Sequence, residues 1–268
     1  MSSLGTMLLV TTVAGAATGL GALPVFFTSQ VTPRVYDSAL GLAAGMMIAA
    51  SVFGLIIPGM EDGTLTAVMI GVFIGGFMLL VGNRVIPHVH AHVKEWRAEG
   101  GAEGDADANT EAEAESPELA TRARRALLIG GAITLHNAPE GLAIGVAFAA
   151  GIDEVAMLLA VIIGLQNVPD GFAFAVPMSE TGMSSPRVLL YTTLSGLVPQ
   201  VLASLFGFSL VAVATGLFPV AAGFAAGAML AVVFREMIPS AVDHPDAATA
   251  SFLVGFVVLI VVDTVVVV

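Results

Sequence analysis

The stretch LHNAPEGLAIG (residues 135–145) places a histidine, an asparagine, a proline and a glutamate inside a segment that is otherwise apolar. A second stretch, QNVPDGFAFAV (166–176), repeats this pattern at an offset of 30 residues. Gln166 takes the place of His136 and Asp170 that of Glu140, while the Asn, Pro and Gly positions are unchanged. The repeated motif predicts two neighbouring helices that present related polar faces to each other.

The chain around these motifs has the composition of a membrane protein. Of its 268 residues, 57% are hydrophobic and 11% are charged, whereas a soluble domain carries roughly 25% charged residues. The absence of cysteine excludes disulfides and thiolate metal sites, and the net charge of −12 argues against a nucleic-acid partner. We therefore expect a single all-α transmembrane domain over residues 1–268, embedded in a lipid bilayer.

Eight apolar segments are long enough to cross the hydrocarbon core, which takes about 20 helical residues. Gly, Ala and Ser run through all of them and permit close packing of helices. The sixth and seventh segments are separated by a turn expected at ATGLFP (214–219). The first is expected to be a retained span and not a signal peptide, because it lacks a basic start. The expected spans are 4–27, 36–58, 64–87, 124–150, 154–178, 188–212, 215–239 and 248–268.

The basic residues are distributed unevenly between the joints of these spans. All nine Lys and Arg residues fall in or beside the joints after spans 1, 3, 5 and 7. The joints after spans 2, 4 and 6 hold only acidic charges, namely Glu61, Asp62, Asp153 and Glu154. Because Lys and Arg are retained on the cytoplasmic side, we expect a multi-pass protein of the cell membrane with both termini extracellular.

The joint between spans 3 and 4, at about residues 88–121, is acidic and rich in Gly and Ala. This composition predicts a disordered cytoplasmic loop. The loop begins with His88, His90 and His92 in PHVHAHVKEW. Such a run can bind a divalent metal through imidazole nitrogens. The alternative is the end of a helix at the membrane interface, whose polar residues face lipid headgroups.

Glu140 and Asp170 are expected near the middle of the membrane, where an ionised Asp costs about 2.5 to 3.5 kcal/mol. No Lys or Arg stands in the middle of any expected span. The charges of the two carboxylates therefore require either His136 or a bound metal dication as a counter-charge. The alternative is a pair of proline-kinked packing helices whose polar groups satisfy one another.

The spacing within each motif favours a metal site. His136 and Glu140 share one helix face because they are four residues apart, and so do Gln166 and Asp170. The two faces together offer one imidazole, two carboxylates and an amide oxygen, a set that suits Zn²⁺, Fe²⁺, Mn²⁺ or Co²⁺. Asn137 and Asn167, one position further on, could bound an adjacent second site that shares the carboxylates.

Each motif also contains a proline, Pro139 or Pro169. A proline inside a helix cannot donate to the carbonyl four residues earlier and kinks the helix. The carbonyls of Leu135 and Leu165 are therefore expected to be free near the candidate ligands. Irregular backbone at this depth is tolerated only where it is buried in protein or lines a cavity.

HNAPEG and QNVPDG together resemble the paired motifs on the fourth and fifth helices of the ZIP (Zrt/Irt-like) metal transporters, closest to the GufA-like branch. Three further stretches are similar to that family: GLGALPVFF (19–27), SVFGLIIPGME (51–61) and AAGAMLAVVFREMIP (225–239). The resemblance implies uptake of divalent transition metal into the cytoplasm, with Zn²⁺ foremost and Fe²⁺, Mn²⁺ or Cd²⁺ also possible. It further implies an elevator-like movement, a homodimer and no prosthetic group.

By resemblance, His136, Glu140, Gln166 and Asp170 match one metal site, and Asn137 and Asn167 match a second that shares the carboxylates. Two positions depart from the family pattern. Relatives commonly read SGxxEP where this chain has SGLVPQ (195–200), so that Gln200 is the candidate replacement for the missing glutamate. Relatives often have two adjacent acids where Arg235 and Glu236 stand. Glu236 is therefore a further candidate ligand that an ion pair with Arg235 would weaken.

Other function classes agree less well with the sequence. An intramembrane metalloprotease would carry HExxH on a helix, and this motif is absent, so that no enzymatic activity is expected. A passive metal channel would use the same residues as a carrier. A proton-linked carrier of another solute could use the histidine and the two carboxylates as a relay. A metal sensor would bind the ion without flux.

Overall fold

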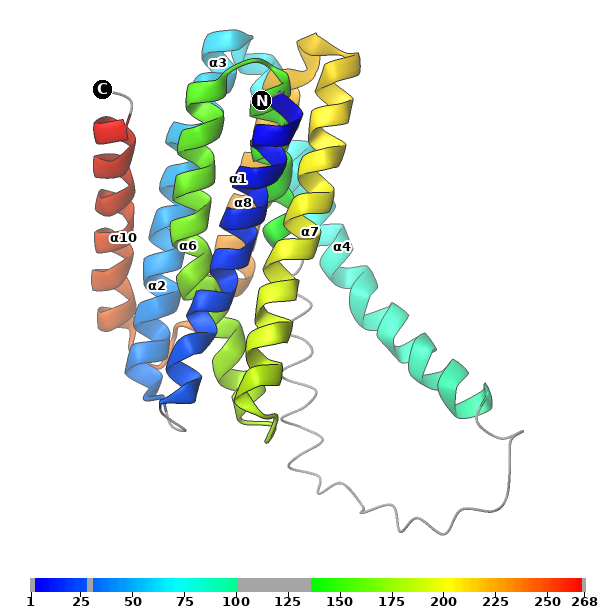
Figure 1. Cartoon of the computed structure of the whole chain (residues 1–268), viewed down its shortest axis with the longest axis vertical. Coiled ribbons are helices and arrows are strands. Elements are labelled where there is room, and N and C mark those ends of the chain that lie inside the picture. Colours follow the sequence, from blue (N-terminus) through cyan, green and yellow to red (C-terminus); the bar gives the residue numbers. More distant parts are fainter. Residues whose placement is uncertain (1–2, 28–30, 101–135, 267–268) are drawn as a thin grey trace.

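The computed structural model describes residues 3–27, 31–100 and 136–266, apart from the side chains of residues 83–100 and of positions 3, 215, 263 and 266. Within this part of the chain the regular structure is helical, without strands (Figure 1). The chain begins with α1 (Ser3–Ala17), which continues into the 3₁₀-helical η1 (Thr18–Phe26). The expectation of an all-α protein is therefore confirmed.

The remaining helices follow in chain order. The second helical segment consists of α2 (Pro33–Ala49), the π-helical η2 (Ala50–Ile56) and α3 (Ile57–Asp62). It is followed by α4 (Leu65–Gly100). After a helix over 136–149 come α6 (Asp153–Ser179) and α7 (Ser185–Val213). The next helical segment consists of η3 (Thr215–Leu217), α8 (Phe218–Val232), the π-helical η4 (Val233–Met237) and α9 (Ile238–Ser240). The last helix is α10 (Pro245–Val266).

Seven helical segments in the described residues are long and apolar enough to cross a membrane. With the helix over 136–149 they account for the eight predicted spans. The turn predicted at 214–219 is confirmed, because α7 ends at Val213 and α8 begins at Phe218. Both termini lie at the same end of the bundle (Figure 1), as an even number of crossings requires. The chain is thus a polytopic membrane protein.

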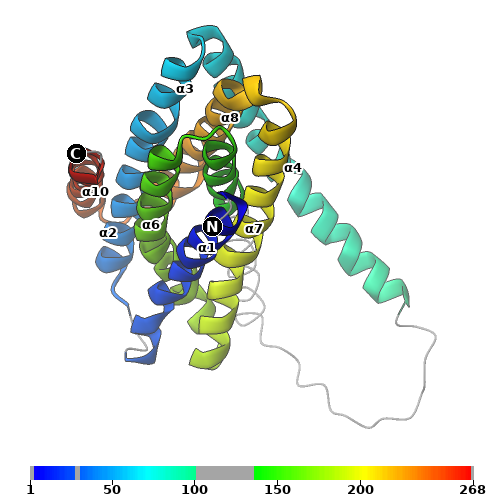
Figure 2. The ribbon, with the colours of Figure 1, turned by 45° about the horizontal axis from the view of Figure 1, so that its top comes forward.

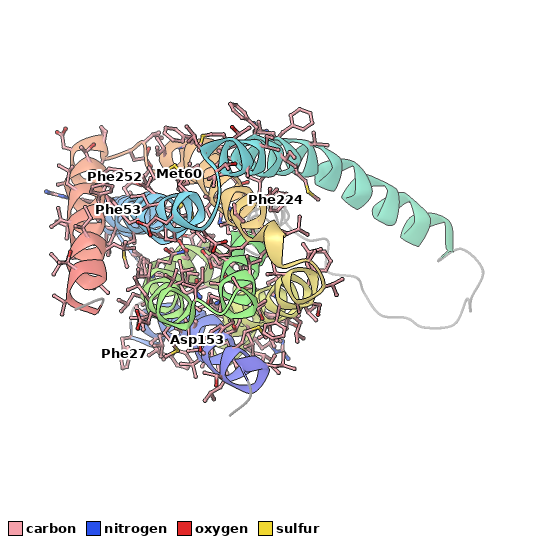
Figure 3. All side chains as sticks on the ribbon, turned by 90° about the horizontal axis from the view of Figure 1, so that it is seen from above. Phe27, Phe53, Met60, Asp153, Phe224 and Phe252 are labelled. Carbon is pink, nitrogen blue, oxygen red and sulfur yellow. The ribbon has the colours of Figure 1, made fainter. Side chains whose placement is uncertain are left out.

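The helices form two layers when the bundle is viewed from above (Figure 3). We call the first the site layer: it contains α1 with η1, the helix over 136–149, α6 and α7. The second layer contains α2 with η2 and α3, α4, α8 with η4 and α9, and α10, which lies at its edge beside α2 (Figure 2). The most extensive packing joins partners within a layer, although α2 also touches α6.

Small residues set the close packing of the second layer. In the α4–α8 pair, a Cβ atom added at Gly71 or Gly75 would collide with the backbone of α8, and one at Gly223 or Gly227 would collide with that of α4. Glycines four residues apart lie on one helix face and let two backbones approach closely. The abundance of small residues in the sequence therefore has a specific structural use.

Two π-helical segments in the second layer were not predicted. Each is followed by an Ile-Pro pair, Ile57–Pro58 after η2 and Ile238–Pro239 after η4. The backbone N–H groups of Ile57 and Ile238 donate five residues back, to Val52 and Val233. A proline lacks the N–H that would continue the α-helical ladder, and both single π-turns lie directly before such a proline. The two rods cross the layer in opposite directions (Figure 1).

The long α4 bears on the predicted loop at about 88–121. The helix continues to Gly100, beyond the predicted end of the third span at residue 87. His88, His90 and His92 therefore lie on helical backbone, but their side chains are outside the described part. Residues 101–121 are also outside it, so that disorder of the loop and metal binding by these histidines stay predictions.

Charges at the helix ends follow the predicted asymmetry. Arg34 and Arg187 lie in the first turns of α2 and α7, at the end of the bundle opposite to the termini (Figure 1). Glu61 and Asp62 end α3, and the acids at 153 and 154 begin α6, at the same end as the termini. Arg34 and Arg187 thus lie at the end opposite to the termini, although acids also occur there, namely Glu180 at the end of α6 and Asp246 at the start of α10.

Candidate metal site

A cluster of buried polar side chains occupies the interior of the site layer. The residues come from three helices, and none exposes more than 5% of its surface. Gln166 is the middle residue of α6, which places the cluster halfway along that helix. The structure therefore brings together all of the predicted principal ligands. The cluster comprises His136, Asn137 and Glu140 of the helix over 136–149, Gln166, Asn167 and Asp170 of α6, and Gln200 of α7.

The two repeated motifs are joined directly at their centres. Nε2 of Gln166 donates a hydrogen bond of 2.7 Å to Oε1 of Glu140. The other carboxylate oxygen of Glu140, Oε2, and the amide oxygen of Gln166 are buried without a hydrogen-bond partner among the described residues. Buried acceptors normally find a donor, and an unmet one is costly. Two buried acceptors without a donor, on residues that contact each other, favour a cation.

The ionisable groups in the cluster are close enough to influence one another. The carboxylates of Glu140 and Asp170 repel each other electrostatically, and His136 is near enough to Asp170 to attract it. One imidazole cannot balance two carboxylates inside a membrane unless one of them stays neutral. A bound dication would balance both charges, which agrees with the ligand set inferred from the sequence.

The geometry nevertheless differs from a site made of charged ligands alone. Among the described residues, no three His, Asp or Glu side chains converge on one metal-sized point. A metal in this cluster would therefore need the amide oxygen of Gln166 to complete its shell, or a shift of His136 towards the carboxylates. Oxygen-rich sets with one nitrogen still suit borderline first-row dications.

His136 contacts the second layer. Its Nε2 lies 2.8 Å from Oε2 of Glu236, and because a carboxylate is the acceptor, the imidazole nitrogen is the donor. The Glu236 side chain is 20% exposed, whereas that of His136 is 6% exposed. Glu236, a secondary candidate from the sequence, thus contacts the principal histidine.

Asn167 and Gln200 form a neutral group beside the carboxylates. Nδ2 of Asn167 donates to the backbone carbonyl of Ala14 at 2.8 Å and to Oε1 of Gln200 at 2.9 Å. Oδ1 of Asn167 and Nε2 of Gln200 are buried without a hydrogen-bond partner among the described residues. The group therefore ties α1, α6 and α7 together and offers one further amide oxygen next to the predicted second site.

Glycines at the end of each motif bring the backbones close together. A Cβ atom at Gly141 would collide with the carbonyl of Gln200 on α7, and one at Gly171 would collide with the carbonyl of Thr18 on η1. Each motif is thus held against a different helix of the site layer. Pro169 lies inside α6, which continues to Ser179, and the free carbonyls expected at 135 and 165 stay a prediction.

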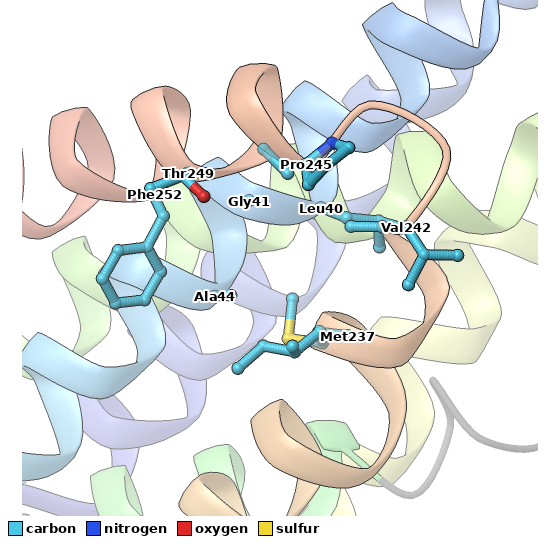
Figure 4. A pocket seen from close by; sticks show the side chains of 11 residues that line it. Leu40, Gly41, Ala44, Met237, Val242, Pro245, Thr249 and Phe252 are labelled. Carbon is cyan, nitrogen blue, oxygen red and sulfur yellow. The ribbon is translucent and has the colours of Figure 1, made fainter.

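An apolar cavity of about 360 Å³ lies in the second layer between α2, α9 and α10 (Figure 4). Its lining includes Leu40, Ala44, Met237 and Phe252, with Thr249 as a polar member. None of the buried polar residues of the cluster lines it. A cavity with this lining offers no ligand set for a dication.

A third buried carboxylate, outside the cluster, was not singled out by the sequence. Asp37 on α2 is 1% exposed and accepts a hydrogen bond of 2.6 Å from the backbone N–H of His244, just before α10 begins. Nδ1 of His244 lies 3.4 Å from the same carboxylate oxygen. The two residues are 207 positions apart, so that only the packing of α10 on α2 reveals the contact.

Comparison with known proteins identifies a single family. The model of the ZIP zinc transporter family matches residues 3–263. The zinc transporter GufA of Myxococcus xanthus is 36% identical, covering 97% of this chain and 98% of its own. The zinc transporter ZIPB of Bordetella bronchiseptica is 34% identical over 93% of this chain and 77% of its own. The human zinc transporter ZIP11 is 31% identical over 92% of this chain and 93% of its own.

Proposed function

This chain belongs to the ZIP zinc transporter family, a family of metal transporters and not of enzymes, and from that premise we propose that it carries Zn²⁺ into the cytoplasm through the buried cluster. His136, Glu140, Gln166 and Asp170 hold the ion. Fe²⁺, Mn²⁺, Co²⁺ and Cd²⁺ are candidate competitors, because the ligand types alone do not rank them. The zinc is the cargo and not a resident cofactor.

The observation that carries the proposal is the pair of unmet oxygens at the junction of the two motifs. Oε2 of Glu140 and Oε1 of Gln166 are buried acceptors without a donor among the described residues. They lie at the middle of a membrane helix, together with the charge of Asp170 and the imidazole of His136. A dication would satisfy both oxygens and balance the two carboxylates at once.

Asn137, Asn167 and Gln200 line a second, weaker position in this proposal. Oδ1 of Asn167 is an available acceptor. Oε1 of Gln200, in contrast, already accepts a hydrogen bond from Nδ2 of Asn167. Amide oxygens carry no net charge and attract a dication less than carboxylates do. We therefore expect one tightly held zinc ion per transport event and a second only at high zinc concentration.

Transport would proceed by movement of one layer against the other. The site layer carries all the principal ligands, and its helices pack most closely with one another. A sliding of this layer along the second layer would carry the ion from one membrane face to the other, which is an elevator-type mechanism. The expected surroundings are the cell membrane, with His88, His90 and His92 offering an accessory cytoplasmic metal site.

The central experiment measures zinc entry into proteoliposomes that contain the purified protein. We expect saturable, temperature-sensitive uptake that is abolished by His136→Ala and by Asp170→Ala, while Glu61→Ala at an exposed helix end retains it. Size-exclusion chromatography and thermal melting establish that the variants fold. Undiminished uptake in both site variants would refute the site assignment. Single-channel currents would indicate a passive channel that uses the same residues.

The substrate range follows from a competition series in the same liposomes. Zn²⁺ uptake is measured against increasing Fe²⁺, Mn²⁺, Cd²⁺ and Co²⁺. We expect Cd²⁺ and Co²⁺ to compete more strongly than Mn²⁺, because the single imidazole favours the softer or later metals. Equal competition by Mn²⁺ would show that the carboxylates and amides dominate the selection.

The orientation is testable because the natural chain has no cysteine. Asp153→Cys lies at the acidic end of α6, and Ser184→Cys lies at the opposite end of the bundle, just before α7. A membrane-impermeant thiol reagent is expected to label the first in intact cells and the second only after lysis. The reverse pattern would place the termini in the cytoplasm.

Light scattering of the purified protein tests the proposed homodimer.

A further inference from the structure

The hydrogen bond between His136 and Glu236 connects the two layers of the bundle. His136 belongs to the site layer, whereas Glu236 lies in η4 of the second layer. A further side-chain hydrogen bond between the layers is longer, 3.4 Å from the Tyr36 hydroxyl to the carbonyl of Ala173. The short contact therefore involves the single nitrogen ligand of the proposed metal site.

The same ring nitrogen cannot serve both partners. Nε2 of His136 donates to the Glu236 carboxylate at 2.8 Å, which requires a proton on that nitrogen. A metal ligand must instead offer a lone pair, and a protonated imidazole nitrogen has none. An ion coordinated through Nε2 would therefore have to displace Glu236.

We propose that Glu236 is a positioning residue that competes with the metal for His136 and joins the two layers when the site holds no ion. This inference rests on the proposed transport function. When zinc binds, His136 turns towards Glu140 and Asp170 and the link between the layers breaks. When zinc leaves, the His136 imidazole again donates to the Glu236 carboxylate and restores the contact between the layers.

The surroundings of Glu236 leave it room to change position. It lies in the π-helical turn η4, directly before Ile238 and Pro239, so that its helix lacks a regular α-helical ladder there. The next residue, Met237, borders the apolar cavity between α2, α9 and α10 (Figure 4). The cavity therefore provides free volume beside η4 into which a small shift of the turn can extend.

The competing role for Glu236 is that of an additional metal ligand, and the two roles predict opposite effects of mutation. If Glu236 competes with the metal, removing its side chain strengthens zinc binding at His136. If it is a ligand, removing its side chain weakens zinc binding. Glu236→Gln separates charge from hydrogen bonding, because the amide is neutral but its oxygen still accepts from the imidazole.

The first test is zinc affinity, measured by isothermal titration calorimetry on the full-length protein in nanodiscs. Glu236→Ala and Glu236→Gln lose the same charge, so their difference reports the hydrogen bond alone. We expect Glu236→Ala to bind zinc about fivefold more tightly than Glu236→Gln, which is the effect expected of one hydrogen bond between neutral groups. Equal affinities, or tighter binding by Glu236→Gln, would overturn the inference. Absence of zinc binding by the wild-type protein would instead refute the proposed function.

The second test follows the link between the layers. Spin labels on Glu61→Cys in the second layer and Glu154→Cys in the site layer report their separation by pulsed electron paramagnetic resonance. Zinc should change the distance distribution of the wild type. Glu236→Ala without zinc should already show the zinc-bound distribution, and Glu236→Gln should stay close to the metal-free wild type. A wild-type distribution in metal-free Glu236→Ala would show that the contact does not join the layers.

Discussion

The motifs HNAPEG (136–141) and QNVPDG (166–171) are nearly the same in sequence but have different partners in the structure. The first position of one, His136, reaches across to Glu236 in the second layer. In QNVPDG the first residue, Gln166, contacts Glu140 within the site layer and donates a hydrogen bond to it. The final glycines also differ, since Gly141 packs on α7 and Gly171 packs on η1.

This difference shows that a repeated motif can supply one site without making its two halves equivalent. The shared spacing places an acid and its first-position partner on one face of each helix. The neighbours of each helix then decide the second contact. The first-position contact of QNVPDG stays within the site layer, whereas we propose that His136 of HNAPEG exchanges its contact with Glu236 for a metal. The following experiments test that division.

The largest effect on zinc binding and uptake is expected when residues 136 and 166, the first positions of the two motifs, are made identical. His136→Gln removes the only imidazole of the cluster and should lower zinc affinity and uptake at least about 100-fold, the upper end of what loss of a supporting metal contact costs. Gln166→His adds a second imidazole, and because zinc binds imidazole nitrogen well, it should keep or tighten zinc binding. Calorimetry and liposome flux measure both. Equal losses in the two variants would mean that the halves are equivalent.

A smaller effect is expected at the two glycines. Gly141→Ala and Gly171→Ala force a Cβ atom against a backbone carbonyl, which should cost about 1–3 kcal/mol of stability and lower the thermal melting temperature in detergent. Gly82→Ala is the matched control, because a Cβ atom there meets nothing within 4 Å. If both site variants melted like the control, the close approach of the motifs to α7 and η1 would be wrong.

Substitution in the neutral group of Asn167 and Gln200 should change stability and zinc affinity less than the changes above. Asn167→Ala removes the donor to Oε1 of Gln200 and to the carbonyl of Ala14, with an expected loss of about 1 kcal/mol and little change in zinc affinity. Ser209→Ala, an exposed serine on α7, is the control for thermal melting. A loss of zinc binding as large as in His136→Gln would instead make Asn167 a principal ligand.

The smallest change in uptake is expected from Gln200→Glu. The new carboxylate would lie next to Asn167 and would need a cation to offset its burial. We expect zinc content, measured by elemental analysis, to rise by a second ion per chain, while uptake keeps its order of magnitude. Unchanged zinc content would show that the neutral group cannot become a metal position.

The sequence by itself determined the membrane class, the span count and the principal candidate ligands. These properties are local, since apolar length identifies a spanning helix and a spacing of four residues identifies a shared face. The cluster that gathers His136, Glu140, Gln166 and Asp170 in the structure was therefore expected from two short motifs. The turn between α7 and α8 was found in the same way, from a break in the apolar pattern.

Only the tertiary structure decided which residues meet across long distances in the chain. The contact of His136 with Glu236 and that of Asp37 with His244 join positions 100 and 207 residues apart. The π-helical turns before Pro58 and Pro239 also became visible only in the structure. Periodicity reports which face of a helix is polar, but the partner of that face is set by how the helices pack. The candidate ligands could therefore be read from the sequence, whereas the contact of His136 with Glu236 could not.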